Sequence, residues 1–322
     1  MKKTIPQLLI HGGAGSRFPN VEQAEIRGRS LKKILDEIYP KMRKGLSAVE
    51  AVTLAVSMLE DDPLYNAGFG SKVQSDGQIR MSASLMDGDK RVFSGCVNVT
   101  KIRNPIFLAR ILQENEDRVL GSDGALQMAK NLGLPLRSPF TAERKIELAQ
   151  YLKSLGREKK TNADWRKRAA AGQFDSNASV VSVKSASAKK FGGKMGTVGA
   201  VACDSQGRLA AATSTGGRGF EFPHRVSDSA TVAGNYANAQ CALSATGIGE
   251  QINEFGLAVR LATHCELGKD LEVSAKKLLA LAKKEKLEFG FIALNRHKMV
   301  ALTATDHLIW ASARGKEMLL NP

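Results

Sequence analysis

The stretch Gly196-Thr197-Val198-Gly199-Ala200-Val201-Ala202 opens a run of small and β-branched residues more than halfway along the 322-residue chain. A threonine hydroxyl in mid-chain is a poor nucleophile because no base lies beside it. If the peptide bond between Gly196 and Thr197 is broken, Thr197 gains an α-amino group whose pKa of about 7.7 to 8.0 leaves a useful fraction neutral at pH 7. The stretch therefore predicts a cleavage site that creates an N-terminal threonine nucleophile carrying its own base.

Polar residues suited to completing such a site follow in order along the chain. Thr215 comes at the end of a predicted strand and offers a second hydroxyl. Arg225 and Asp228 suit the two ends of an amino acid, because a guanidinium binds a carboxylate bidentately and a carboxylate accepts hydrogen bonds from an ammonium group. Thr246 and Gly247 then provide a hydroxyl and a close-approaching backbone amide, which is the chemistry of an oxyanion hole.

Six motifs in this order resemble the plant-type L-asparaginase/isoaspartyl peptidase family of N-terminal nucleophile hydrolases. They are His11 to Gly15, Asn66 to Ser71, Gly196 to Ala202, Ala212 to Gly217, Arg225 to Ser229 and Thr246 to Glu250. The resemblance implies an α+β fold, a four-layer αββα sandwich made as a precursor that cleaves itself before Thr197. It implies an α subunit of residues 1–196 and a β subunit of residues 197–322 that together form one globular domain, and a homodimer of such αβ units.

The resemblance also implies catalytic roles. Thr197 would attack the side-chain amide carbon of the substrate while Thr215 orients it. Thr246 and the Gly247 amide would stabilise the oxyanion, and Asn66 would reach the active site.

Binding roles carry over in the same way. Arg225 would bind the substrate α-carboxylate and Asp228 its α-amine, helped by Gly247 and Gly249. The only cofactor implied is a structural sodium ion held by backbone carbonyls. Its ligands would be Leu59, Glu60, Tyr65, Ala67 and Phe69.

The chain departs from the family pattern in three places. Ser227 stands where the family commonly has glycine, and Ile248 replaces a common threonine. The segment from Asn235 to Ser244 is shorter than usual by about two residues. These differences concern the exact substrate more than the reaction class.

The predicted function is hydrolysis of L-asparagine to aspartate and ammonia, of β-aspartyl (isoaspartyl) dipeptides, or of both. The two substrates stay open because each presents the same free α-carboxylate and α-amine. An aspartylglucosaminidase-like hydrolase is one alternative. The other is an uncleaved, non-enzymatic scaffold or nucleic-acid binder.

Composition indicates a packed globular core, since 43% of the residues are hydrophobic and 25% are charged. The formal net charge is +15. Residues 157–196 hold ten basic and three acidic residues, a net of +7, among Ala, Ser and Gly. A flexible, solvated linker explains this segment better than a nucleic-acid groove, because its only aromatic residues are Trp165, Phe174 and Phe191, too few and too scattered to form a stacking platform.

The remaining residue patterns favour a cytoplasmic protein with no membrane partner. The apolar run near the amino terminus reaches only Ile10, too short for a signal or a membrane span. The cysteines lack CxxC spacing and predict buried, reduced thiols, and the five histidines form no HExxH metal motif. His11 is interpreted as a packed, hydrogen-bonded residue.

Periodicity predicts the secondary structure. Strands are expected at residues 7–10, 79–85, 91–99, 197–203, 208–214, 289–294, 299–305 and 308–313. Helices are expected at 21–44 with an interruption at Pro40, from Ser47 to about 60, from Asn104-Pro105 onward, from Thr141 to about 156, at 249–266 and at 272–284. Strands followed by helices and again strands indicate antiparallel sheets covered by helices.

Overall fold

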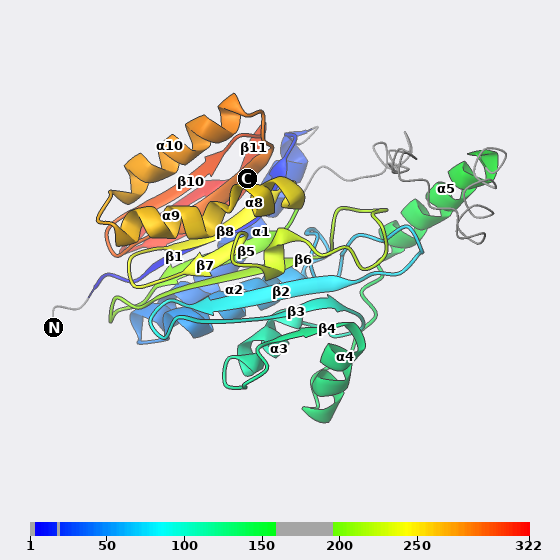
Figure 1. The fold of residues 1–322 in the computed structure, drawn as a ribbon, viewed down its shortest axis with the longest axis horizontal. Coiled ribbons are helices and arrows are strands. Elements are labelled where there is room, and N and C mark those ends of the chain that lie inside the picture. The colour runs from blue at the N-terminus through cyan, green and yellow to red at the C-terminus, as the bar shows by residue number, and fades with distance from the viewer. Residues whose placement is uncertain (1–3, 18–19, 159–195) are drawn as a thin grey trace, which may run out of the picture.

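The computed structural model describes residues 4–17, 20–158 and 196–322, which form a mixed structure of two β-sheets and surrounding helices (Figure 1). The larger sheet has eight strands in the order β12-β11-β1-β5-β6-β2-β3-β4. Their bounds, in chain order, are β1 Gln7–Gly15, β2 Met81–Asp87, β3 Val92–Val99, β4 Val119–Gly121, β5 Val198–Cys203, β6 Leu209–Thr215, β11 His307–Arg314 and β12 Glu317–Asn321. All neighbours pair antiparallel except β3 and β4, which are parallel.

The smaller sheet has four strands in the order β10-β9-β8-β7. They are β7 Asn235–Ala237, β8 Ala242–Gly247, β9 Phe289–Leu294 and β10 Met299–Thr303. The helices are α1 Val21–Arg43, α2 Ala48–Asp61, α3 Pro105–Leu112, α4 Ser122–Asn131, α5 Ala142–Glu158, the short 3₁₀ turn η1 Asp228–Ala230, α8 Gly249–Phe255, α9 Leu257–Glu266 and α10 Leu271–Lys284.

Three hydrophobic clusters join these elements. The first lies between the large sheet and helices α1, α2 and α3, and the second between the small sheet and helices α8 to α10. The third lies between the sheets, where Leu9 and Val201 of the large sheet share a cluster with Ile292 of the small sheet. Figure 1 shows the same arrangement, with α9 and α10 beyond the small sheet and α2 and α3 beyond the large one.

The hairpin of β5 and β6 decides which way the key threonines face. Side chains alternate between the two faces of a strand. Val198 and Ala200 belong to the cluster under the helices, whereas Val201 and Cys203 belong to the cluster between the sheets. Thr197 shares the parity of Val201, so its side chain is directed toward the small sheet.

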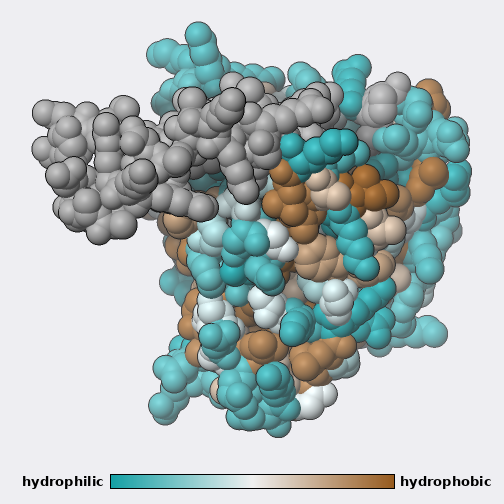
Figure 2. Space-filling view, turned by 90° about the vertical axis from the view of Figure 1, so that its right-hand side faces the viewer, coloured by the Kyte–Doolittle hydropathy of each residue, from teal (hydrophilic) through white to brown (hydrophobic). Residues whose placement is uncertain are grey.

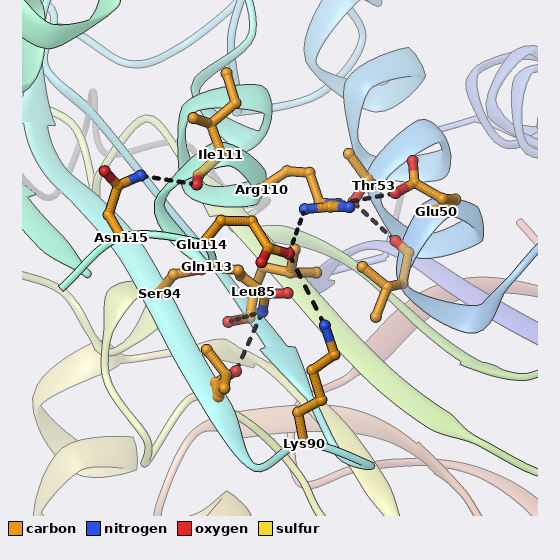
Figure 3. A network of polar contacts seen from close by, with 12 residues as sticks. Glu50, Thr53, Leu85, Lys90, Ser94, Arg110, Ile111, Gln113, Glu114 and Asn115 are labelled. Carbon is orange, nitrogen blue, oxygen red and sulfur yellow. Dashed lines mark hydrogen bonds and ion pairs between the residues drawn. The ribbon is translucent and has the colours of Figure 1, made fainter. Parts of the chain in front are cut away.

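A polar network fastens α3 to its neighbours (Figure 3). Arg110 donates from Nε to Glu50 of α2 at 2.8 Å and forms a 3.5 Å ion pair with Glu114. Lys90 lies 3.9 Å from the same Glu114 carboxylate, and Gln113 donates to the Val92 carbonyl at 3.1 Å. These contacts hold α3 against α2 and the β2–β3 hairpin, far along the sheet from Thr197.

Several predicted boundaries are wrong. Pro40 lies inside α1 without ending it, because it is exposed and close to the helix end, where water can bind the carbonyl that it leaves without a donor. Gly256, in the left-handed conformation with φ of 63°, divides the single helix predicted for 249–266 into α8 and α9. Strands β4, β7, β8 and β12 and helix α4 were not predicted.

Other local predictions are confirmed. The Ser47 hydroxyl accepts from the Glu50 amide at 3.2 Å, as a helix cap does. Asn104 precedes α3 as predicted but does not cap it, because its side-chain amide donates to the Ser57 carbonyl of α2 instead. Helix α5 runs to Glu158, two residues into the predicted linker, and the rest of that linker up to residue 195 lies outside the described residues.

The cysteines behave as predicted, since Cys96, Cys203, Cys241 and Cys265 are all buried and none forms a disulfide. Within the described ranges, each helix is too short or too polar to cross a membrane.

Candidate active site

A pocket of about 470 Å³ opens where strand β5 begins and strands β6 and β8 end. Residues from distant parts of the chain line it. Among them are Gly196, Thr197, Thr215, Arg218, Arg225, Ser227, Gly247, Gly249, Glu288 and Asp306. The lining therefore brings together most of the residues predicted for the site and mixes basic with acidic side chains.

Thr197 immediately precedes β5 and is only 4% exposed. Val198 is paired with Ser214, so the antiparallel register continues to Thr197 opposite Thr215. The partner of the Thr197 hydroxyl is nevertheless the Ser229 hydroxyl, 3.1 Å away. The Thr215 hydroxyl instead accepts from the Gly217 amide at 3.2 Å and thereby shapes the turn after β6.

Thr246 and Gly247 end strand β8 beside the Gly196-Thr197 peptide bond. The Thr246 hydroxyl accepts from the Ala14 amide at 3.2 Å. A Cβ atom on Gly196 would lie 3.0 Å from this hydroxyl oxygen and 3.7 Å from the Gly247 nitrogen. Gly196 thus lies against the two groups predicted to stabilise an oxyanion.

Arg225 is held by Glu250, a residue whose role the sequence did not reveal. The guanidinium donates from Nε and Nη2 to the two Glu250 oxygens, each at 2.7 Å. Hydrogen bonding from Arg225 lowers the pKa of Glu250 to about 2. The edge of the guanidinium formed by Nε and Nη2 is therefore bound to Glu250. A substrate carboxylate has to bind the remaining N–H groups of the guanidinium.

Asp228 is 1% exposed and lies behind Ser227, which lines the pocket in its place. The Ser227 hydroxyl donates to Asp228 Oδ1 at 3.0 Å, whereas Oδ2 is buried without a hydrogen-bond partner among the described residues. Burial is the main reason that the pKa of Asp228 is raised to about 6, although Ser227 and Arg225 act in the opposite direction. Asp228 Oδ2 can therefore accept a further hydrogen bond, but Asp228 does not line the pocket.

Gly249 allows Asp228 and Arg225 to approach each other. A Cβ atom at this position would lie 2.7 Å from Asp228 Oδ1 and 2.8 Å from Arg225 Nη2. Both distances are shorter than real Cβ atoms show, so a side chain here has to displace one of the two charged groups.

Asn66 does not line the pocket but lies behind one of its lining residues, Gly217. It is 3% exposed, and its side-chain amide donates to the Gly217 carbonyl at 2.6 Å while accepting from the Lys72 amide at 2.9 Å. Its own carbonyl accepts from the Gly216 amide at 2.9 Å. The structure therefore places Asn66 as a support for the turn after β6, whose Gly217 lines the pocket.

A second set of polar side chains lies between the sheets. The Ser244 hydroxyl is 2.7 Å from that of Thr213 and 2.9 Å from His11 Nε2. His11 is fully buried, and burial lowers its pKa to about 3, so the ring is neutral at physiological pH. These contacts confirm that His11 is a packed, hydrogen-bonded residue.

Sequence reasoning did not assign roles to Ser229 or Glu250. Ser229 shares its parity with Ser227 in the loop sequence Ser227-Asp228-Ser229, a weak signal that both hydroxyls face the same way. Glu250 carries no such signal, because its partner Arg225 is 25 residues away in the chain and only packing brings the two together.

The arrangement is suited to acyl transfer. The Thr197 hydroxyl as candidate nucleophile, the Gly247 amide as candidate oxyanion donor and the partly buried Arg225 beside a carboxylate meet at one pocket. The second candidate donor, the Thr246 hydroxyl, is buried next to Gly196. The backbone of Gly196, on the amino-terminal side of Thr197, also lies at this pocket. The acyl group that Thr197 would attack has to lie there.

Comparisons with known proteins agree with this chemistry. A model of the asparaginase family matches residues 4–319. The isoaspartyl peptidase/L-asparaginase of Nostoc sp. (strain PCC 7120) is 39% identical over 320 residues, which cover 99% of this chain and 95% of that protein. The proteins of the same name from Synechocystis sp. (strain PCC 6803) and Rattus norvegicus are 38% and 35% identical, covering 95% and 97% of this chain and 87% of each relative. The chain belongs to the asparaginase family.

Proposed function

We propose that this protein hydrolyses the side-chain amide of L-asparagine and the β-aspartyl bond of isoaspartyl dipeptides, using Thr197 as an N-terminal nucleophile released by self-cleavage. The observation that carries the proposal is the position of the Gly196-Thr197 peptide, which lies in the pocket between the Ser229 hydroxyl and the Thr246 and Gly247 groups. The relatives from Nostoc, Synechocystis and rat are named isoaspartyl peptidase/L-asparaginase, which supports the same reaction.

In the mature protein, the free α-amine of Thr197 takes the hydroxyl proton as Thr197 attacks the substrate carbonyl carbon. Thr215, opposite Thr197 in the hairpin, orients the nucleophile. The Thr246 hydroxyl and the Gly247 amide stabilise the oxyanion, where removing one such donor typically costs about 2.7 to 4 kcal/mol of transition-state stabilisation. Ammonia or the amino acid leaves, and water then hydrolyses the ester on Thr197.

Arg225 binds the α-carboxylate through the guanidinium N–H groups that are not bonded to Glu250. Asp228 accepts from the α-amine once Ser227 rotates its hydroxyl aside, and Gly249 gives the substrate room between the two. Asn66 supports the Gly217 turn from behind. The same two contacts serve both substrates, because asparagine and β-aspartyl dipeptides share the free α-groups.

We infer that the two sheets and their helices form the four-layer αββα sandwich of N-terminal nucleophile hydrolases. Residues 1–196 are then the α subunit and residues 197–322 the β subunit of one domain. The pairing of β5 with β1 and β6 supports this division, since cleavage before Thr197 leaves the hydrogen bonds of the sheet intact.

A sodium ion fits the loop after α2. A Cβ atom on Gly70 would lie 2.7 Å from the carbonyl oxygen of Tyr65, a predicted ligand, and 2.9 Å from that of Pro63, so two carbonyls converge where only glycine fits. Hard cations take such oxygen ligands. The backbone of Leu59, Glu60, Tyr65, Ala67 and Phe69 would hold the ion. When bound, it stiffens the loop that carries Asn66.

We also propose a homodimer of αβ units in the cytoplasm, with no dedicated nucleic-acid or membrane partner. Four buried free thiols suit a reducing compartment. Exposed apolar side chains support an interface between two copies: Phe222 and Val226, on either side of Arg225 in the chain, are 76% and 53% exposed. Figure 2 shows hydrophobic residues among the hydrophilic ones on the face that lies at the right of Figure 1. Light scattering of the purified protein measures the oligomeric state.

The test is Thr197→Ala beside the wild type, with the exposed Thr263→Ala as the matched control. We expect the wild type and Thr263→Ala to give two fragments ending at Gly196 and beginning at Thr197, and to release ammonia from asparagine. Thr197→Ala is expected to remain one full-length chain without activity. A wild-type protein that stays intact by mass spectrometry on prolonged incubation refutes the mechanism and favours a non-enzymatic scaffold.

A further inference from the structure

Four oxygen-bearing side chains form a continuous chain from the nucleophile to a buried carboxylate. The Thr197 hydroxyl is 3.1 Å from the Ser229 hydroxyl, which is 3.2 Å from the Ser227 hydroxyl. The Ser227 hydroxyl in turn donates to Asp228 Oδ1 at 3.0 Å. All four residues are at least nine-tenths buried, and of the four only Thr197 and Ser227 line the pocket.

The carboxylate gives this chain a direction. Ionised Asp228 only accepts hydrogen bonds, so Ser227 has to donate its single hydroxyl proton to it. Ser227 then offers lone pairs to Ser229, and Ser229 offers lone pairs to Thr197. The arrangement allows one proton to leave Thr197 and another to reach Asp228, with each serine passing on its own proton.

Before cleavage, Thr197 lacks the base that it uses in turnover, because its nitrogen is part of the peptide bond to Gly196. The neutral ring of His11 contacts the Ser244 hydroxyl and interacts with the backbone of Thr197, whereas the Thr197 hydroxyl itself is bonded to Ser229. Self-cleavage therefore requires a base that the mature reaction does not.

We propose that Asp228 is the base for self-cleavage of the precursor and receives the Thr197 proton through Ser229 and Ser227. This inference rests on the proposed function. It assigns Ser227 and Ser229 a positioning and relay role before any substrate binds.

As the proton leaves, Thr197 Oγ forms a bond to the Gly196 carbonyl carbon, and the carbonyl oxygen becomes negative. The bond from this carbon to the Thr197 nitrogen then breaks, and the nitrogen takes back the proton that Asp228 had accepted, leaving an ester. Water hydrolyses that ester, which yields the Gly196 carboxylate and the free Thr197 hydroxyl and amine.

The surroundings of Asp228 make the step pH-dependent. Of the charged groups among the described residues that act on it, Arg225 from its own loop lowers the pKa and Glu250 from α8 raises it, while burial raises it most, to about 6. The base is ionised above this value and protonated below it. The rate of cleavage is therefore expected to rise with pH through about 6 and to level off near 7.

The experiment follows newly made precursor. Each protein is synthesised without cells in the presence of labelled methionine, and the loss of full-length chain is timed on denaturing gels from pH 5 to 8. The variants are Ser227→Ala, Ser227→Gly and Asp228→Asn. The control is Ser94→Ala, which removes a buried hydroxyl bonded to the Ala109 carbonyl, away from the site.

We expect all three relay variants to cleave at least about tenfold more slowly than the wild type and to lose the rise near pH 6, whereas Ser94→Ala keeps the wild-type rate and profile. Ser227→Gly removes the hydroxyl with little strain on the turn, and thermal melting of each variant identifies slow cleavage that comes from misfolding. A further variant, Asp228→Ala, removes the carboxylate, and added formate is expected to accelerate its cleavage by supplying one.

Two results overturn the proposal. One is cleavage of Ser227→Ala or Ser227→Gly within twofold of the wild-type rate with the same pH profile. The other is Asp228→Asn that melts like the wild type and keeps the rise near pH 6. A wild-type chain that never splits would instead remove the proposed function itself, so the two failures are distinguishable.

Discussion

Arg225 and Glu250 form a two-point ion pair at the rim of the pocket, with both nitrogen–oxygen distances at 2.7 Å. The Arg225 side chain is 13% exposed and that of Glu250 is 46% exposed, so the guanidinium is largely removed from water while its partner is not. A fixed and partly desolvated guanidinium is prepared for a second anion. This geometry separates recognition of the substrate from the chemistry at Thr197.

Arg225→Ala is expected to self-cleave and yet to lose kcat/KM on asparagine. A bidentate, charge-assisted contact contributes on the order of 2 to 4 kcal/mol, which corresponds to roughly 30- to 1000-fold. Steady-state kinetics on the processed fragments measure the loss. Glu250→Gln keeps Arg225 but loosens it, so KM should rise about tenfold with a smaller change in kcat. Near-normal kcat/KM in processed Arg225→Ala would make the pair a surface ion pair.

Gly249→Ala should impair substrate binding because the added Cβ overlaps Asp228 and Arg225. Overpacking of this kind costs about 1 to 3 kcal/mol, so kcat/KM should fall roughly 5- to 160-fold. Gly124→Ala is the matched control, since a Cβ at Gly124 meets nothing within 4 Å. Equal activity of the two variants would show that Gly249 has room to spare.

His11 should make the fold sensitive to acid. Burial lowers its pKa to about 3, whereas an unfolded histidine titrates near 6.5. The stabilising contribution is therefore present above about pH 6.5 and is lost as the pH falls toward 3. Urea unfolding from pH 7 to 4 should show a smaller loss of stability in His11→Gln than in the wild type, by roughly 3 kcal/mol. His297→Gln, at an exposed position, should follow the wild type.

Glu60 should have the opposite effect. Burial raises its pKa to about 8, despite hydrogen bonds from Ser214 and Ile106, whereas an unfolded glutamate titrates near 4.3. Its contribution to stability is thus present below about pH 4.3 and is lost as the pH rises through 8. From pH 5 to 8.5 the wild type should lose roughly 3 to 5 kcal/mol of unfolding free energy relative to Glu60→Gln. Glu285→Gln, at an exposed position, serves as the control. If the unfolding free energies of Glu60→Gln and the wild type differ by the same amount at every pH, the assignment is refuted.

Much of the frame was readable in the sequence. Alternating small and β-branched residues predict the hairpin of β5 and β6, because a strand presents every second side chain to each face. The capping residue Ser47 and the order of the motifs from Thr197 to Glu250 needed no tertiary information either. The predicted single helix at 249–266 failed where Gly256 adopts the left-handed conformation, which glycine permits but does not require.

What the sequence by itself determined is the presence of the groups: a threonine at the start of a strand, an arginine and an aspartate in one loop, and a hydroxyl beside a glycine. Which of them touch was decided only by the tertiary structure. Ser229 meets Thr197 across 32 residues and Glu250 meets Arg225 across 25. Such contacts depend on how two sheets and a loop pack together. The local sequence pattern around a residue indicates its secondary structure but not which distant residue it contacts.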